Sequence, residues 1–115
     1  MRVKWSFHYS KLVKHPVLKA QPISITIEPT TACNLGCPEC PSGLKKFTRP
    51  EGNLKQDFYK KVIDQTYKKS YYLNFYFHGE PFINPNFLEM VSYASSKKMY
   101  TATSTNAHFL NDKNA

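Results

Sequence analysis

The cysteine-rich stretch from residue 28 to residue 43 constrains this chain more than any other feature. It reads Glu-Pro-Thr-Thr-Ala-Cys-Asn-Leu-Gly-Cys-Pro-Glu-Cys-Pro-Ser-Gly and contains all three cysteines of the 115-residue sequence. Three residues separate Cys33 from Cys37 and two separate Cys37 from Cys40, so one short loop can direct three thiolates at one point. Gly36 is expected to permit a tight turn between the first two cysteines. The loop is therefore a candidate metal-binding segment.

Three thiolates from one loop suit an iron-sulfur cluster better than a structural zinc ion. Structural zinc sites are closed and usually take their ligands from two separated pairs, whereas a four-iron cluster held by three cysteines leaves one iron open. A zinc-binding interaction module remains the alternative, with His78 as the fourth ligand beside the cysteines. A disulfide framework is disfavoured because the number of cysteines is odd.

The rest of the chain alternates between strand and helix patterns, which predicts an α/β fold. Residues 23–27 alternate isoleucine with polar residues and predict the first strand. Residues 71–77 are almost continuously aromatic and apolar, which predicts a strand buried on both faces. Residues 100–105 predict a third strand, and residues 41–53 a loop. The order strand, helix, strand, helix, strand is typical of a parallel sheet.

Two segments with helical spacing lie between the predicted strands. The second is expected to begin with Asn84 as its N-cap and Pro85 in its first turn. The apolar stripe expected in the first helix consists of Leu54, Phe58, Val62 and Ile63, with Tyr59 and Tyr67 on its flank. The buried stripe expected in the second consists of Phe87, Leu88, Val91 and Ala94.

One polar motif follows the second predicted strand directly, and another lies at the end of the third. Residues 78–81 read His-Gly-Glu-Pro, and residues 103–106 read Thr-Ser-Thr-Asn. Barrel enzymes build their active sites at the C-terminal ends of the strands. The cysteine loop, which follows the first strand, is therefore expected to share one site with both motifs.

With these motifs, the sequence resembles the radical S-adenosylmethionine (SAM) superfamily. The signature of that family is a CxxxCxxC loop after the first barrel strand, with a Gly-Gly-Glu-Pro motif after the second, which Gly79, Glu80 and Pro81 match here. The resemblance implies a partial (β/α) barrel of the radical SAM type and a 4Fe-4S cluster ligated by the three cysteines. The Cys-Pro-x-Cys-Pro-Ser-Gly run is similar to the branch that carries a SPASM domain, many members of which modify peptides or proteins.

The resemblance also implies the chemistry and the cofactor-binding residues. Reduction of the cluster would cleave bound SAM to a 5'-deoxyadenosyl radical, which abstracts hydrogen from a substrate. Glu80 would pair with the methionyl ammonium group of SAM, beside Gly79 and Pro81. Asn106 lies in a stretch similar to the family's Thr-Thr-Asn-Gly and is a further cofactor-binding candidate. Ala107 stands where that family motif has glycine.

The length of the chain predicts that it forms only part of a barrel domain. A (β/α)8 barrel takes ~250 residues, so the sequence is expected to be the N-terminal part of a core domain, truncated after the third strand. Residues 21–115 would form that part, and residues 1–20, with five basic and no acidic side chains, a basic extension. An inactive truncated fragment of such an enzyme is a further alternative.

The net charge of +8 indicates which classes of partner the chain could bind. The basic blocks are interpreted first as solvated helix faces, and the partner expected from the resemblance is an acidic electron donor of the flavodoxin or ferredoxin type. Nucleic acid is disfavoured. No apolar run is long enough to span a membrane, no secretory signal is visible, and unpaired cysteines favour the cytoplasm.

Overall fold

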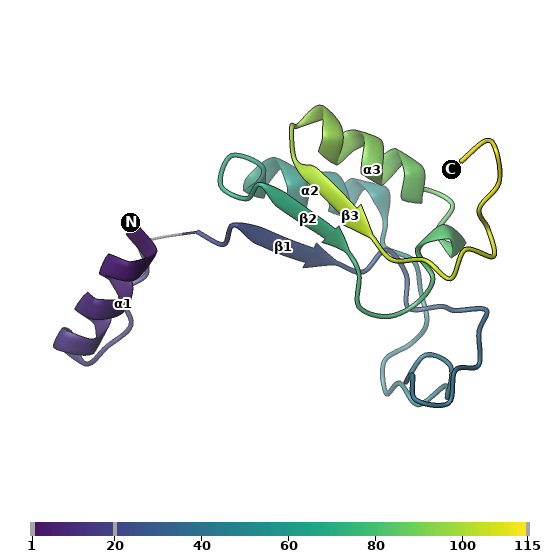
Figure 1. The fold of residues 1–115 in the computed structure, drawn as a ribbon, viewed down its shortest axis with the longest axis horizontal. Coiled ribbons are helices and arrows are strands. Elements are labelled where there is room, and N and C mark those ends of the chain that lie inside the picture. Colours follow the sequence, from purple (N-terminus) through teal and green to yellow (C-terminus); the bar gives the residue numbers. More distant parts are fainter. Residues whose placement is uncertain (1, 20, 115) are drawn as a thin grey trace.

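The computed structural model describes residues 2–19 and 21–114 and contains a three-stranded parallel sheet (Figure 1). The strands lie in the order β1-β2-β3, and α2 and α3 cover one face of the sheet. The predicted α/β class is therefore confirmed. The elements are α1 (Arg2–Val13), β1 (Ser24–Ile27), α2 (Gln56–Thr66), β2 (Tyr72–Phe75), the 3-10 helix η1 (Pro81–Ile83), α3 (Phe87–Ser96) and β3 (Tyr100–Thr103).

The register of the sheet brings the ends of the three strands to one edge. Ile27 of β1 pairs with Phe75 of β2, and Phe75 pairs with Thr103 of β3. Because the strands are parallel, the segments that leave them all start at this edge. The cysteine loop and both polar motifs therefore begin side by side.

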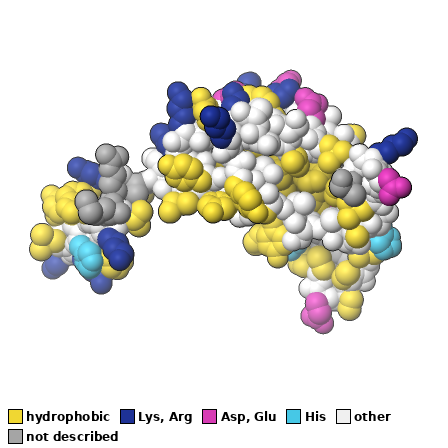
Figure 2. All heavy atoms as spheres, turned by 45° about the horizontal axis from the view of Figure 1, so that its top comes forward, with side chains coloured by type: hydrophobic (Ala, Val, Ile, Leu, Met, Phe, Trp, Pro, Cys, Tyr) yellow, Lys and Arg dark blue, Asp and Glu magenta, His cyan; other side chains and the backbone are white. Residues whose placement is uncertain are grey.

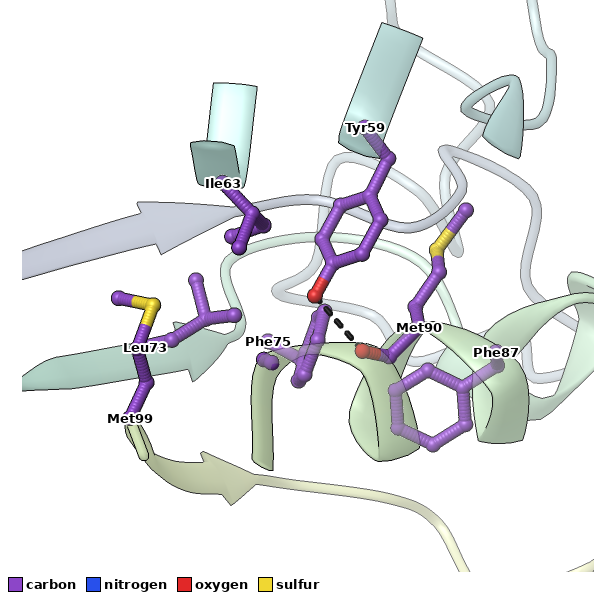
Figure 3. Close-up of a cluster of buried hydrophobic side chains, with 8 residues drawn as sticks. Tyr59, Ile63, Leu73, Phe75, Phe87, Met90 and Met99 are labelled. Atoms are coloured by element: carbon purple, nitrogen blue, oxygen red, sulfur yellow. Dashed lines mark hydrogen bonds between the residues drawn. The ribbon is translucent and has the colours of Figure 1, made fainter. Parts of the chain in front are cut away.

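The hydrophobic core lies between the sheet and the two helices (Figure 3). Tyr59 from α2 crosses this core, and its hydroxyl donates a hydrogen bond to the carbonyl oxygen of Met90, 2.7 Å away. Burial of the ring raises the pKa of Tyr59, so the hydroxyl stays protonated and can act as the donor. The buried hydrophobic residues are Tyr59, Ile63, Leu73, Phe75, Phe87, Met90, Ala94 and Met99.

The faces that the helices bury differ from the predicted stripes at two positions. In α2, Phe58 is 60% exposed while Tyr59 is fully buried, the reverse of the prediction. In α3, Leu88 is exposed and Met90 is buried. Neighbouring residues of a helix point about 100° apart, so the rotation of α2 about its axis decides whether Phe58 or Tyr59 faces the core. The hydrogen bond of Tyr59 to the other helix favours the observed rotation, since a buried hydroxyl needs a partner.

The prediction that the second strand is buried on both faces is wrong. Leu73 and Phe75 are fully buried under the helices, whereas Tyr72 and Tyr76 on the opposite face are exposed. Helices cover only one face of the sheet (Figure 1). On the other face Tyr72 packs edge-on against Tyr100 of β3, with ring centroids 5.4 Å apart.

The predicted start of the second helix is also wrong. Its N-cap is Asn86, and Asn84 instead ends η1. The buried side chain of Asn84 donates from Nδ2 to the carbonyl oxygens of Pro29, at 2.7 Å, and Leu54, at 3.2 Å. Its Oδ1 accepts from the N–H of Asn86 at 2.9 Å. Asn84 thus closes the turn before α3 and also satisfies backbone groups of distant segments, which a local capping pattern cannot indicate.

The N-terminal helix α1 stands apart from the sheet at one end of the molecule (Figure 1). In the sequence, Trp5, Phe7 and Tyr9 alternate as in a strand, while Trp5 and Tyr9 also share a helical face; the structure forms a helix. Its Trp5 and Tyr9 rings stack at 4.9 Å and are both exposed. Basic but no acidic side chains are visible around α1 in Figure 2. The predicted boundary between an extension and a core domain falls at residue 20, outside the described residues.

None of the helices within residues 2–19 and 21–114 combines the length and the apolar character needed to cross a bilayer.

Candidate functional site

Three hydrogen bonds join the cysteine loop to the two polar motifs. The backbone N–H of Glu80 donates to the carbonyl oxygen of Ala32 at 2.8 Å. The N–H of Gly79 donates to Ser42 Oγ at 3.3 Å, and Asn106 Nδ2 donates to Asn34 Oδ1 at 2.8 Å. The structure thus brings together the segments in which the sequence predicted a shared site.

The cysteine loop is folded back on itself between its second and third cysteines. The N–H of Cys40 donates to the carbonyl oxygen of Cys37 at 3.2 Å, and the N–H of Leu44 donates to that of Cys40 at 2.9 Å. All three cysteines carry free thiols; Cys37 is exposed, and Cys33 and Cys40 are partly buried. Cys37 is therefore the most accessible of the three cysteines.

The backbone stabilises the thiolate form of Cys40. Hydrogen bonds from the backbone N–H groups of Gly43 and then Ser42 hold the pKa of the Cys40 thiol below its usual range. The thiolate is the form of cysteine that binds metals. Ser42 also accepts the Gly79 hydrogen bond, so it links the cysteine loop to the Gly-Glu-Pro motif.

Among the described residues, no three histidine, cysteine, aspartate or glutamate side chains form a group arranged to hold a metal ion. This applies to the three cysteines and to the alternative set with His78. The His78 ring instead packs edge-on against Phe47 and Phe77. The donor types on the loop, three free thiols with one stabilised thiolate, fit a cluster with three cysteine ligands.

The glycine that the loop requires is Gly43, whereas the sequence pointed to Gly36. A Cβ atom on Gly36 would meet nothing within 4 Å, and the backbone there has no positive φ. A Cβ atom on Gly43 would lie 2.5 Å from the nitrogen and 2.6 Å from the oxygen of Cys37. Gly43 thus allows the end of the loop to pack against the backbone of its middle cysteine. In the sequence, the position of Gly43 shortly after the third cysteine was the one feature that could have indicated this role.

Gly79 and Pro81 occupy the tightest part of the site. Gly79 has φ +77°, and a Cβ atom there would overlap the carbonyl oxygen of Thr30 and lie 2.9 Å from that of Ala32. Pro81 is buried and begins η1. The motif after β2 is therefore pressed against the segment that leads into Cys33.

The Glu80 carboxylate points to the end of β3. Its side chain is buried, with Oε1 accepting from Thr105 Oγ1 at 2.6 Å and Oε2 accepting from the N–H of Asn106 at 2.8 Å. Sequence reasoning singled out Glu80 and Asn106 but missed Thr105, which donates to Glu80, and Asn34, which accepts from Asn106. Thr105 stood within the Thr-Ser-Thr-Asn motif, whereas Asn34 had no signal besides lying between two cysteines.

Ala107 adopts a left-handed conformation, with φ +65°. Alanine is strained there by about 1 kcal/mol relative to glycine, so we expect Ala107→Gly to raise the free energy of unfolding by up to about 1 kcal/mol. Urea denaturation measures this change in the free energy of unfolding, and the m-value should stay the same. Ala102→Gly on β3, where φ is not positive, should instead lower stability. Equal destabilisation by both changes would contradict the assigned strain.

Comparison with solved structures supports the fold. The crystal structure of BtrN in complex with AdoMet and 2-DOIA superposes with a TM-score of 0.73, at 24% identity, over 84% of this chain and 41% of BtrN. BtrN in an open conformation superposes with a TM-score of 0.69. At this identity the likeness concerns the fold, and it agrees with a partial α/β barrel.

Comparison with curated proteins decides the family, although no family model matches the chain. The mycofactocin maturase MftC of Mycobacterium tuberculosis is 38% identical over 86 residues, which are 74% of this chain. The chain belongs to the radical SAM superfamily. A second relative, the tungsten-containing aldehyde ferredoxin oxidoreductase cofactor-modifying protein of Pyrococcus furiosus, is 30% identical over 76% of this chain.

The radical SAM relatives are longer than this chain. The match spans 21% of the length of the M. tuberculosis MftC and 24% of that of the P. furiosus protein. MftC and BtrN are radical SAM enzymes, and the predicted membership of that superfamily is confirmed.

Proposed function

We propose that this chain forms the cluster-binding and SAM-binding part of a radical SAM enzyme. The observation that carries the proposal is the convergence of three motifs at one sheet edge, joined by the hydrogen bonds of Glu80, Gly79 and Asn106. Family membership supports it, because radical SAM enzymes use iron-sulfur clusters and SAM.

Cys33, Cys37 and Cys40 are the proposed ligands of a 4Fe-4S cluster. Their spacing on one loop and the lowered pKa of the Cys40 thiol support this assignment. When bound, such a cluster supplies the electron that cleaves SAM to a radical able to abstract hydrogen from a substrate. The role of the protein is to hold the thiolates and to orient the cosubstrate.

Gly79, Glu80, Pro81 and Asn106 form the proposed SAM-binding wall. They lie beside the cysteine loop, because Gly79 has no side chain and lets the motif pack against the carbonyl oxygens of Thr30 and Ala32. BtrN, whose crystal structure holds AdoMet, shares the fold over 84% of this chain.

The proposed partners are an acidic electron donor and a peptide or protein substrate. Lys45 and Lys46 are exposed on the turn that follows the cysteine loop. The N–H of Lys46 donates to the carbonyl oxygen of Pro41 at 3.0 Å, so this turn is tied to the loop. Positive charge there complements an acidic flavodoxin or ferredoxin. Free thiols favour the cytoplasm as the compartment.

Anaerobic reconstitution of the full chain with iron and sulfide tests the proposal. We expect about four irons and four sulfides per chain and a broad visible absorbance, lost in Cys37→Ala, because each iron-bound thiolate is needed to hold the cluster. His78→Ala should retain the cluster. Uptake of one zinc without sulfide, with loss of the metal in His78→Ala, would instead establish the zinc-binding alternative.

A further inference from the structure

The most buried charged group at the site is the Glu80 carboxylate. Glu80 is 2% exposed and follows β2 at the edge where the strands end. The ion pairs formed among the described residues are Arg49 with Glu28, Lys60 with Glu89 and Lys97 with Asp64, and none includes Glu80. A buried carboxylate needs compensating hydrogen bonds, so its partners reveal its role.

Three hydrogen bonds from neutral groups compensate this charge. Oε1 accepts from Thr105 Oγ1 at 2.6 Å and from the N–H of Phe82 at 3.3 Å. Oε2 accepts from the N–H of Asn106 at 2.8 Å. The short contact with Thr105 is typical of a charge-assisted hydrogen bond. With two hydrogen bonds on Oε1, one on Oε2 and almost no exposed surface, the carboxylate has little capacity left for a ligand.

The same contacts link the end of β3 to the cysteine loop. Asn106 is held through its backbone N–H by Glu80, and its side chain donates to Asn34 Oδ1 at 2.8 Å. Asn34 lies between Cys33 and Cys37. The backbone N–H of Glu80 separately donates to Ala32, the residue before Cys33. Glu80 therefore connects the ends of β2 and β3 to the loop that bears the thiols.

We propose that Glu80 is a positioning residue of the SAM site, whose carboxylate holds Thr105 and Asn106 against the cysteine loop instead of pairing with the ammonium group of SAM. The inference rests on the proposed function and replaces the direct ion pair that the sequence predicted. Contacts of this wall with the ligand are then left to Gly79, Pro81 and Asn106, not to the Glu80 side chain.

Hydrogen exchange of the metal-free chain gives the first test. Glu80→Gln removes the negative charge and one of the two acceptor oxygens, so its amide cannot accept from Phe82 and from Asn106 at the same time. We expect the Asn106 amide to exchange at least about tenfold faster, with the amides of β2 unchanged. Thr105→Val removes only the hydroxyl donor and should also make the Asn106 amide exchange faster. Glu89→Gln, on an exposed carboxylate of α3, is the matched control.

Binding to the reconstituted chain gives the second test, with two probes. These are SAM and its analogue in which hydrogen replaces the amino group. Loss of a hydrogen bond to a charged group is expected to weaken binding roughly ten- to hundredfold. Because the effect passes through Asn106, Glu80→Gln should weaken both probes by the same factor, and adding Asn106→Ala should weaken them little further.

The outcomes distinguish this inference from the proposed function. Weakening of SAM alone, with the analogue unaffected, would establish a direct ion pair and overturn the positioning role. Unchanged exchange of the Asn106 amide in Glu80→Gln and Thr105→Val would also overturn it. A wild-type chain that takes up iron and sulfide but binds neither probe would overturn the proposed function, while the exchange measurement would still decide whether Glu80 holds Asn106.

Discussion

Replacement of Gly79 with alanine is expected to lower the free energy of unfolding by about 3 kcal/mol. The left-handed φ of +77° costs an alanine about 1–2 kcal/mol, and overlap of its Cβ with the carbonyl oxygen of Thr30 adds an overpacking cost of about 1–3 kcal/mol. The segment leading into Cys33 must move to relieve this overlap. We therefore also expect less iron per chain after reconstitution.

Gly52→Ala is the matched control for this change. A Cβ atom on Gly52 would meet nothing within 4 Å, and φ is not positive there. Its stability should stay within about 0.5 kcal/mol of the wild type. Chemical denaturation measures both variants. A Gly79→Ala protein as stable as Gly52→Ala would contradict the close packing of residues 78–81 on the cysteine segment.

Replacement of Gly43 with alanine is expected to damage the cysteine loop itself. The added Cβ would lie 2.5 Å from the nitrogen of Cys37, so either Cys37 or residues 42–43 must shift. A shift of residues 42–43 removes N–H groups that stabilise the Cys40 thiolate. We expect the pKa of the Cys40 thiol to rise toward its usual range and most of the bound iron to be lost.

The pH dependence of alkylation of the metal-free chain reports the thiol pKa, and iron analysis reports the cluster. The matched control is Gly36→Ala, in the same loop, where the added Cβ meets nothing within 4 Å. It should behave as the wild type in both measurements. If Gly36→Ala lost the cluster and Gly43→Ala kept it, the assignment of the constrained glycine would be reversed.

Much of the site could be predicted from the sequence because its parts are local motifs. The cysteine spacing, the Gly-Glu-Pro motif and the Thr-Ser-Thr-Asn motif each follow a strand, and parallel strands end at one edge. The contacts between motifs could not be predicted. Asn34 and Asn106 are 72 positions apart, and no local pattern indicates that two such side chains meet.

The errors in the helices have the same origin. Phe58 and Tyr59 are neighbours of similar size, and helical spacing fits either as the buried one. Burial of Tyr59 depends on the carbonyl oxygen of Met90, which α3 supplies. Asn84 resembles a helix cap in sequence and accepts from the N–H of Asn86, but its amide nitrogen is fixed by the carbonyl oxygens of Pro29 and Leu54. In each case a polar group from a distant segment determined which residue is buried or where the helix begins.

The sequence by itself determined the α/β alternation, the order of the elements and the identity of the candidate ligands, because periodicity, motif spacing and the chemistry of cysteine are properties of short segments. Only the tertiary structure decided which glycine the loop needs and what the Glu80 carboxylate binds. A close approach at Gly43 exists only when the loop is folded back on Cys37. The partners of a buried carboxylate likewise exist only once β3 lies beside β2, since burial makes its hydrogen bonds obligatory.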